Sequence, residues 1–202
     1  MPIFHDAAPI RSSAKLHDAL SHFSALKEKH NRWMNIRPST VVRQRILYPH
    51  PLYSIRLIDL IAGKTLSSTL KRVAWIYFLR DRQNRLACAE VSIMAGIHKN
   101  VRLSEGLFVK KAFRLIVKTR SDKRARRHKF RLSSIRAESL HFFTLWLRGN
   151  SRMEYFIPVT PLGGLLAAGQ WISRNELVDA LLPEAQRVRA AHESVFARFA
   201  KK

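Results

Sequence analysis

Residues 110–131 read KKAFRLIVKTRSDKRARRHKFR, and this stretch decides how the rest of the sequence is interpreted. It holds eleven Lys or Arg residues and a single acid, Asp122. Clustered cations bind phosphate backbones by releasing counterions, so the stretch predicts strong affinity for nucleic acid. If six of the cations neutralised phosphates, the logarithmic salt slope of binding would be about −5. The alternative is a solvated basic loop with no partner.

The periodicity on either side of Arg114 predicts a helix followed by a hairpin. Ser104 is a suitable N-cap for a helix over 104–114, although Lys99 is an alternative start. Phe113, Leu115 and Val117 alternate with Arg114, Ile116 and Lys118, a pattern interpreted as a strand. Phe130 with Leu132 predicts the returning strand. Residues 119–129 would then form a basic hairpin tip.

Apolar runs before this segment predict three further helices. The first covers residues 52–62 and ends near Gly63, and the second starts at Ser67 or Ser68 and continues to Leu79. A third covers Leu86 to Ala95, and Gly96 supplies the stop that a helix-turn-helix corner requires.

The predicted order of helices, turn, helix and basic hairpin resembles that of the MarR-like winged-helix regulators. The resemblance covers about a third of the chain and rests on residues 89–97, on the helix 104–114 and on residues 117–125. Asp122, Lys123 and Arg124 match the family's wing motif residue by residue. The resemblance implies a recognition helix in the major groove of DNA and an arginine that follows the phosphates or enters the minor groove.

The expected fold class is therefore mainly α with a small β-hairpin: a winged helix-turn-helix core flanked by N- and C-terminal helices. The sequence predicts an arm and linker over 1–51, the DNA-binding domain over 52–148, and a C-terminal region over 149–202. The arm would hold a helix over 13–34, followed by a linker with a possible short strand. Flanking helices of this kind either form dimers or pack on their own core, and the helix-turn-helix favours a homodimer.

The C-terminal part of the chain shows a mixed pattern. Ser133 or Ser134 would start a helix that continues to Leu147, and residues 153–159 suggest a strand. A turn is predicted at 161–164, and Ser173 is a suitable cap for a final helical region that Pro183 interrupts.

The overall composition agrees with a nucleic-acid-binding protein that has a folded core. The 202 residues include 37 Lys and Arg against 14 Asp and Glu, a formal net charge of +23, and 47% are hydrophobic. Such an excess of positive charge requires a polyanion, and the apolar fraction argues against a disordered polycation. The one cysteine, Cys88, excludes an internal disulfide and is expected to be a small buried residue.

The predicted site is a DNA-binding surface without catalytic residues, cofactor or metal. Acids are few, no His-x-x-x-His pair occurs, and Gly63-Lys64-Thr65 lacks the upstream glycine of a phosphate loop, so we do not expect an enzyme. The predicted DNA-binding residues are Lys99, Asn100, Arg102, Ser104, Lys110, Lys111, Arg114, Lys118, Arg120, Lys123, Arg124, Arg126, Arg127, His128, Lys129 and Arg131.

The function expected from the sequence is sequence-specific binding of double-stranded DNA and regulation of transcription in the cytoplasm, in association with the nucleoid. Replication, partition or nucleoid organisation on a plasmid or phage is a second possibility. A structural RNA-binding role in a ribonucleoprotein particle is a third. Aromatic groups such as 75–78 and 142–146 allow single-strand stacking but are more typical of a core. No signal peptide or membrane span is expected.

Overall fold

A computed structural model of the chain describes residues 3–4, 8–25, 45–81, 83–149 and 153–199. Burial is described for side chains 8–21, 45–81, 83–149 and 153–193. In this structure the chain has a mixed α/β fold built on a mostly antiparallel sheet, and the prediction of a mainly α winged helix-turn-helix is wrong. The strands follow the hydrogen-bonded order β5-β4-β3-β2-β6-β7-β8, with β1 beside β6.

The chain forms two compact units that interleave along the sequence. Unit 1 comprises residues 1–52 and 72–132, and unit 2 comprises residues 53–71 and 133–202. The functional division of the chain at residues 51 and 148 stays a prediction.

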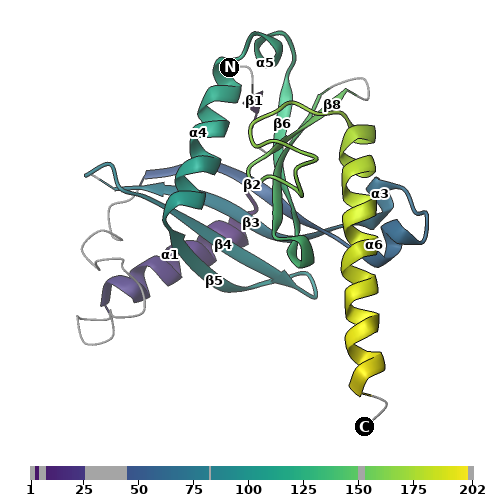
Figure 1. The fold of residues 1–202 in the computed structure, drawn as a ribbon. Helices are drawn as coiled ribbons and strands as arrows, with labels where there is room; N and C mark the ends of the chain where they lie inside the picture. Colours follow the sequence, from purple (N-terminus) through teal and green to yellow (C-terminus); the bar gives the residue numbers. More distant parts are fainter. Residues whose placement is uncertain (1–2, 5–7, 26–44, 82, 150–152, 200–202) are drawn as a thin grey trace. The chain divides into compact units, whose positions relative to one another are not determined.

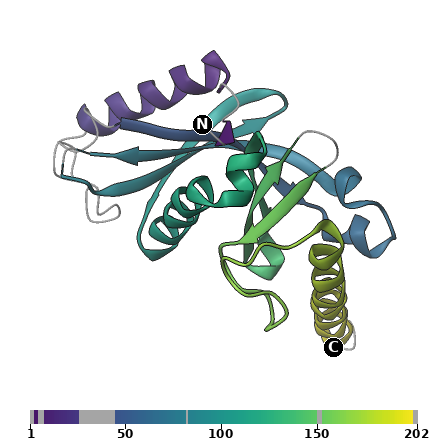
Figure 2. The ribbon, with the colours of Figure 1, turned by 90° about the horizontal axis from the view of Figure 1, so that it is seen from above.

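Unit 1 is a sheet with a helix on each face (Figure 1, Figure 2). Strands β3 and β4 pair antiparallel, as do β4 and β5, while β1 pairs parallel with the start of β6. The elements of this unit, including three strands that it shares with unit 2 (β2, β3 and β6), are β1 (Ile3–Phe4), α1 (Ile10–Ala25), β2 (Arg45–Ile55), β3 (Leu70–Arg80), β4 (Leu86–Met94), β5 (Ile97–Glu105), α4 (Leu107–Ser121), α5 (Lys123–Arg127) and β6 (Phe130–Ala137).

Strand β3 explains why this sheet is difficult to recognise from sequence. Its residues 74–79 are all buried, because Trp75, Tyr77 and Leu79 belong to the core cluster beneath α1 while Phe78 contacts Phe113 of α4 on the other face. A strand covered on both faces has a continuous apolar run rather than an alternating one. Length and periodicity alone do not separate such a run from a buried helix.

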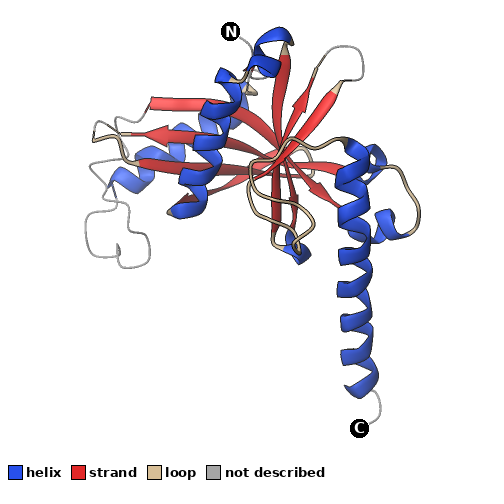
Figure 3. Cartoon of the chain, turned by 45° about the horizontal axis from the view of Figure 1, so that its top comes forward, coloured by secondary structure: helices blue, strands red, loops and turns tan. Residues whose placement is uncertain are grey.

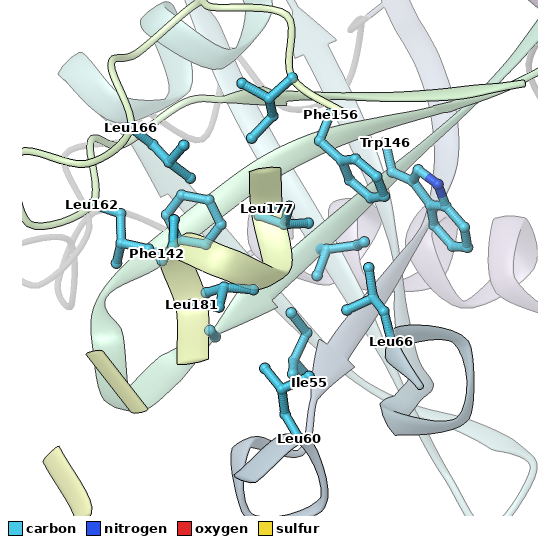
Figure 4. Close-up of a cluster of buried hydrophobic side chains, with 14 residues drawn as sticks. Ile55, Leu60, Leu66, Phe142, Trp146, Phe156, Leu162, Leu166, Leu177 and Leu181 are labelled. Atoms are coloured by element: carbon cyan, nitrogen blue, oxygen red, sulfur yellow. The ribbon is translucent and has the colours of Figure 1, made fainter. Parts of the chain in front are cut away.

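Unit 2 is built around a second hydrophobic core, shown in Figure 4. The rings of Trp146 and Phe156 are stacked within it, with centroids 6.1 Å apart, and Leu177 and Leu181 belong to it from the last helix. The elements that belong to this unit alone are α2 (Leu57–Ile61), α3 (Leu66–Thr69), η2 (Glu138–Leu140), β7 (Phe142–Arg148), β8 (Glu154–Pro158) and α6 (Arg174–Phe199).

Helix α6 begins with a reciprocal cap, as the sequence predicted for Ser173. The amide of Glu176 donates to the Ser173 hydroxyl over 3.3 Å, and the amide of Ser173 donates to the Glu176 carboxylate over 2.7 Å. Two amides that the helix itself cannot satisfy are thereby paired. The prediction that Pro183 interrupts this region is wrong, since the helix continues through it.

Three predicted helices are strands in the structure (Figure 3). The segment that continues to Leu79 is α3 followed by β3, the segment 86–95 is β4, and the segment 133–147 contains β6, η2 and β7. Gly96 lies in the turn between β4 and β5 and has a φ of +76°, which favours glycine. It therefore closes a hairpin rather than a helix-turn-helix corner.

The predicted hairpin around Asp122 is helical in the structure. Residues 113–118, expected as a strand, lie within α4, and residues 119–129 contain the end of α4 and all of α5. Ser104 lies on β5, so it is not the cap of α4, and the predicted start at Lys99 is equally wrong.

Other sequence predictions are confirmed. The strand that begins at Phe130 is β6, the strand predicted over 153–159 is β8, and a helix does end before Gly63. The predicted helix 52–62 starts later than expected, because β2 continues to Ile55.

The N-terminal helix is confirmed as α1 as far as Ala25, and residues 26–34 lie outside the described residues. Most of the predicted linker over 35–51 is also outside them. The described end of it, from Arg45, is part of β2. Of the helices described here, none combines the length and the apolar character needed to cross a membrane.

Candidate nucleic-acid interface

Helix α4 is amphipathic. Its buried residues recur at helical spacing and pack against the sheet of unit 1; they are Val109, Ala112, Phe113, Ile116 and Thr119. Its opposite side exposes Lys110, Lys111, Arg114 and Lys118 to solvent. Because the apolar stripe fixes the rotation of the helix about its axis, the positive charges face outward.

Two contacts attach α4 to the rest of unit 1. The Phe113 ring lies 5.5 Å from the ring of Phe78 and 5.6 Å from that of Tyr48, measured between centroids. Arg120 donates a hydrogen bond of 2.8 Å to the Tyr48 hydroxyl, and its Cζ lies 5.1 Å from the centre of the Tyr48 ring. Arg120, predicted as a DNA contact, is therefore a partly buried anchor of α4.

Helix α5 continues the positive surface after a kink at Asp122. The Asp122 carboxylate accepts a hydrogen bond of 2.8 Å from the amide of Arg124, which makes it the N-cap of α5. Burial opposes ionisation of this carboxyl, but hydrogen bonds from Arg124 and the charges of Arg124 and Lys118 outweigh it and lower the pKa of Asp122 below 3.8. The only acid of the segment is thus used as a helix cap.

We expect Asp122→Ala to lower the free energy of unfolding by about 1 kcal/mol at neutral pH, the usual cost of losing an N-cap. Because the folded-state pKa lies below the unfolded value, the charge contributes stability above about pH 4. That contribution is lost as the pH falls through the folded pKa. Urea unfolding of both proteins at pH 7 and at several values below pH 4 measures the difference.

Asp122→Asn is the matched control for this prediction, since it keeps a capping oxygen without the charge. Its effect should be smaller and almost independent of pH. A difference between wild type and Asp122→Ala that stays constant down to pH 2 would contradict the role of the ionised carboxylate.

The exposed cations of α4, α5 and the start of β6 form one feature, which we call the α4–α5 basic face. Ala125 is fully buried, so α5 turns one side inward and presents its basic residues outward. The basic face consists of Lys110, Lys111, Arg114, Lys118, Lys123, Arg124, Arg126, Arg127, Lys129 and Arg131, all exposed.

The DNA-binding residues predicted just after the helix-turn-helix corner at Gly96 do not lie on the α4–α5 basic face. Lys99, Asn100, Arg102 and Ser104 are exposed residues of β5, not of a recognition helix. Val101 and Leu103 of the same strand pack against the core beneath α1, so Arg102 and Ser104 point to the face that α4 covers. Arg102 stands directly opposite Glu90 in the β4–β5 pair.

His128 and Cys88 are both partly buried. The His128 ring is partly buried, 5.7 Å from the ring of Phe130. Burial, with a contribution from the charge of Glu90, raises the pKa of Cys88 to about 12, so the thiol stays protonated and is a poor nucleophile. Among the described residues, no three His, Cys, Asp or Glu side chains lie close enough together to hold a metal ion.

The structure adds one feature that sequence reasoning missed, a pocket at the start of α4. Arg80 and Arg85 line it from the ends of β3 and β4, and Lys110 and Arg114 line it from α4. The two arginines flank a hairpin turn and are distant in sequence from the basic segment. No spacing in the sequence indicates that they meet Lys110.

No family model matches this chain, and neither the curated proteins nor the solved structures that were compared with it include a match.

Proposed function

We propose that the protein binds double-stranded DNA through the α4–α5 basic face. One observation carries the proposal: ten Lys and Arg residues between positions 110 and 131 are exposed on two consecutive helices, on the short link after them and on the strand that follows. Asp122 is the only acid among them, and its charge is already engaged with Arg124. Such a surface attracts a phosphate backbone.

Residues 107–127 form two packed helices rather than a loop, which supports a defined interface. The buried stripe of α4, the hydrogen bond of Arg120 to Tyr48 and the cap at Asp122 hold the two helices on unit 1. Cations presented on fixed elements lose less conformational entropy on binding than cations in a loop. This preorganisation favours the binding function.

The geometry of α4 favours duplex DNA over RNA. A 15-residue helix is about 22 Å long, and the major groove of B-form DNA, roughly 12 Å wide, admits a helix. The major groove of A-form RNA is deep and narrow and does not.

Stacking of single-stranded bases has little support. Trp75, Tyr77, Phe78, Phe142 and Trp146 are buried, as predicted for a core, and Phe143 is partly buried. Proteins that bind single strands use exposed aromatic platforms.

The proposal is limited to backbone-directed binding of duplex DNA. Sequence-specific readout, regulation of transcription, a homodimer and a location in the cytoplasm with the nucleoid stay predictions, as do the replication or partition role and the RNA-binding role. In the part of the chain that the structure describes, no recognition helix is followed by a β-hairpin wing.

A salt titration with three fluorescent ligands of equal length and mixed sequence tests the proposal: duplex DNA, single-stranded DNA and duplex RNA. We expect the tightest binding to duplex DNA, with a logarithmic salt slope of about −5 or steeper if six or more phosphates are contacted. The mass of the complex, measured in parallel, gives the stoichiometry. Stronger binding to duplex RNA or to single strands would overturn the proposal.

A further inference from the structure

The pocket at the start of α4 in unit 1 has the size of a small-molecule site. It encloses about 740 Å³, within the range of roughly 300–1,000 Å³ that is usual for ligand pockets. Its lining combines the end of β3, the start of β4 and the first two turns of α4. It is lined by Arg80, Asn84, Arg85, Leu86, Glu105, Gly106, Lys110, Phe113 and Arg114.

The charges around the pocket do not cancel. Four of the lining residues are basic and one, Glu105, is acidic. Asp81 lies just outside the lining and pairs with Arg85, Oδ2 to Nε, over 2.7 Å, which accounts for one of the cations. Even with Glu105 fully ionised, the positive charges remain in excess.

The position of Arg80 is set by an aromatic ring. Its Cζ lies 4.8 Å from the centre of the Phe113 ring, in a cation–π contact on the pocket wall. A guanidinium held in this way keeps its fork of N–H donors for an oxyanion. Asp81 also organises the neighbouring turn, because the amide of Arg85 donates to its carboxylate over 2.7 Å.

Glu105 is the one lining residue that disfavours an anion. Burial raises the pKa of its carboxyl, and Asp81 adds to this, whereas the charges of Arg85 and Lys110 oppose it.

We propose that this pocket binds the phosphate group of a nucleotide, a phosphomonoester dianion. Such a group carries about 1.5 to 2 negative charges at neutral pH and three acceptor oxygens, which suits several guanidinium and ammonium donors. The same chemistry is present in a free nucleoside monophosphate and in the 5′-phosphate at the end of a DNA strand. The inference goes beyond the proposed function, since the pocket can hold a phosphate whether or not a duplex lies on the basic face.

Two substitutions inside the pocket test this inference by calorimetric titration with deoxyadenosine monophosphate and with inorganic phosphate. Arg80→Met keeps an alkyl chain against Phe113 and removes the guanidinium, so we expect affinity for the nucleotide to fall roughly ten- to a hundredfold. Glu105→Gln removes the repelling charge and introduces an amide donor, so affinity should rise on the order of fivefold. A gain of affinity cannot result from misfolding.

Two duplexes of identical sequence, with and without a 5′-phosphate, distinguish the two sources of the group. If the phosphorylated duplex binds more tightly and Arg80→Met removes that difference, the ligand is a strand end. If only the free nucleotide shows dependence on Arg80, the ligand is a nucleotide. Either result supports the inference that the pocket binds a phosphate group.

The control is the double substitution Arg126→Gln with Arg127→Gln, which changes the basic face outside the pocket. Nucleotide binding that falls equally in this control and in Arg80→Met would overturn the inference, as would the absence of any Arg80-dependent binding. Failure of the proposed function is recognised separately. If the Arg126→Gln, Arg127→Gln variant binds duplex DNA as tightly as wild type, the basic face is not the DNA-binding surface, whatever the pocket binds.

Discussion

Replacing Arg126 and Arg127 with glutamate is expected to lower the affinity for duplex DNA at least about a hundredfold at a fixed salt concentration. Both side chains are exposed on α5 and are part of the α4–α5 basic face. Each charge-assisted contact to a phosphate is worth about 1.5 kcal/mol or more, and the new carboxylates add repulsion. The logarithmic salt slope should become shallower by about 2, one unit for each lost phosphate contact.

The matched control is Arg11→Glu with Lys15→Glu. These two exposed residues lie on α1, which covers the other face of the sheet in unit 1, and the substitution changes the net charge by the same amount. Binding and slope should stay close to those of wild type, and the thermal midpoint should change little in either variant. Equal losses in both would show that overall charge, not the basic face, determines binding. An unchanged affinity for duplex DNA in the Arg126→Glu, Arg127→Glu variant would show that α5 does not contact the DNA.

The largest expected effect on stability is that of Phe156→Ala. Phe156 is fully buried in unit 2, its ring stacks on Trp146, and its backbone exchanges two hydrogen bonds of 2.9 Å with Ile172. Removing the ring leaves a cavity that the neighbouring side chains cannot fill. We expect the free energy of unfolding to fall by about 3 to 5 kcal/mol.

Urea unfolding followed by tryptophan fluorescence and by circular dichroism measures this loss. Leu165→Ala is the control, because Leu165 is 54% exposed in a turn of the same unit and its truncation should cost less than about 0.5 kcal/mol. Similar costs for the two substitutions would contradict the burial of Phe156 in this core.

The basic surface was predictable from the sequence because it depends on composition and on a single amphipathic period. Val109, Ala112, Phe113 and Ile116 form a helical stripe, and this signal extends through residues 113–118, where the alternation was wrongly interpreted as a strand. A longer window over 107–121 would have identified α4 in full. The position of Arg120 on Tyr48 could not be predicted, since the two residues are 72 positions apart.

The strands were harder to predict than the helices. β3 is buried on both faces, so it does not show the polar alternation of a half-exposed strand. β4 does alternate in burial, but two of its buried residues are the small Ala87 and Ala89, so its apolar side is weakly marked in the sequence. β8 was recognised because turn residues flank it, and the start of β6 because Phe130 and Leu132 alternate with exposed Lys129 and Arg131.

The sequence by itself determined the positive charge, the amphipathic character of α4 and the cap of α6, because each of these depends on residues close together in the chain. Only the tertiary structure decided that β3 and β4 are strands and that Arg80 lies in one pocket with Lys110. The physical reason is that burial on both faces removes the local period from β3, while the pairing of β3 with β4 and the meeting of Arg80 with Lys110 are long-range contacts that local sequence does not encode.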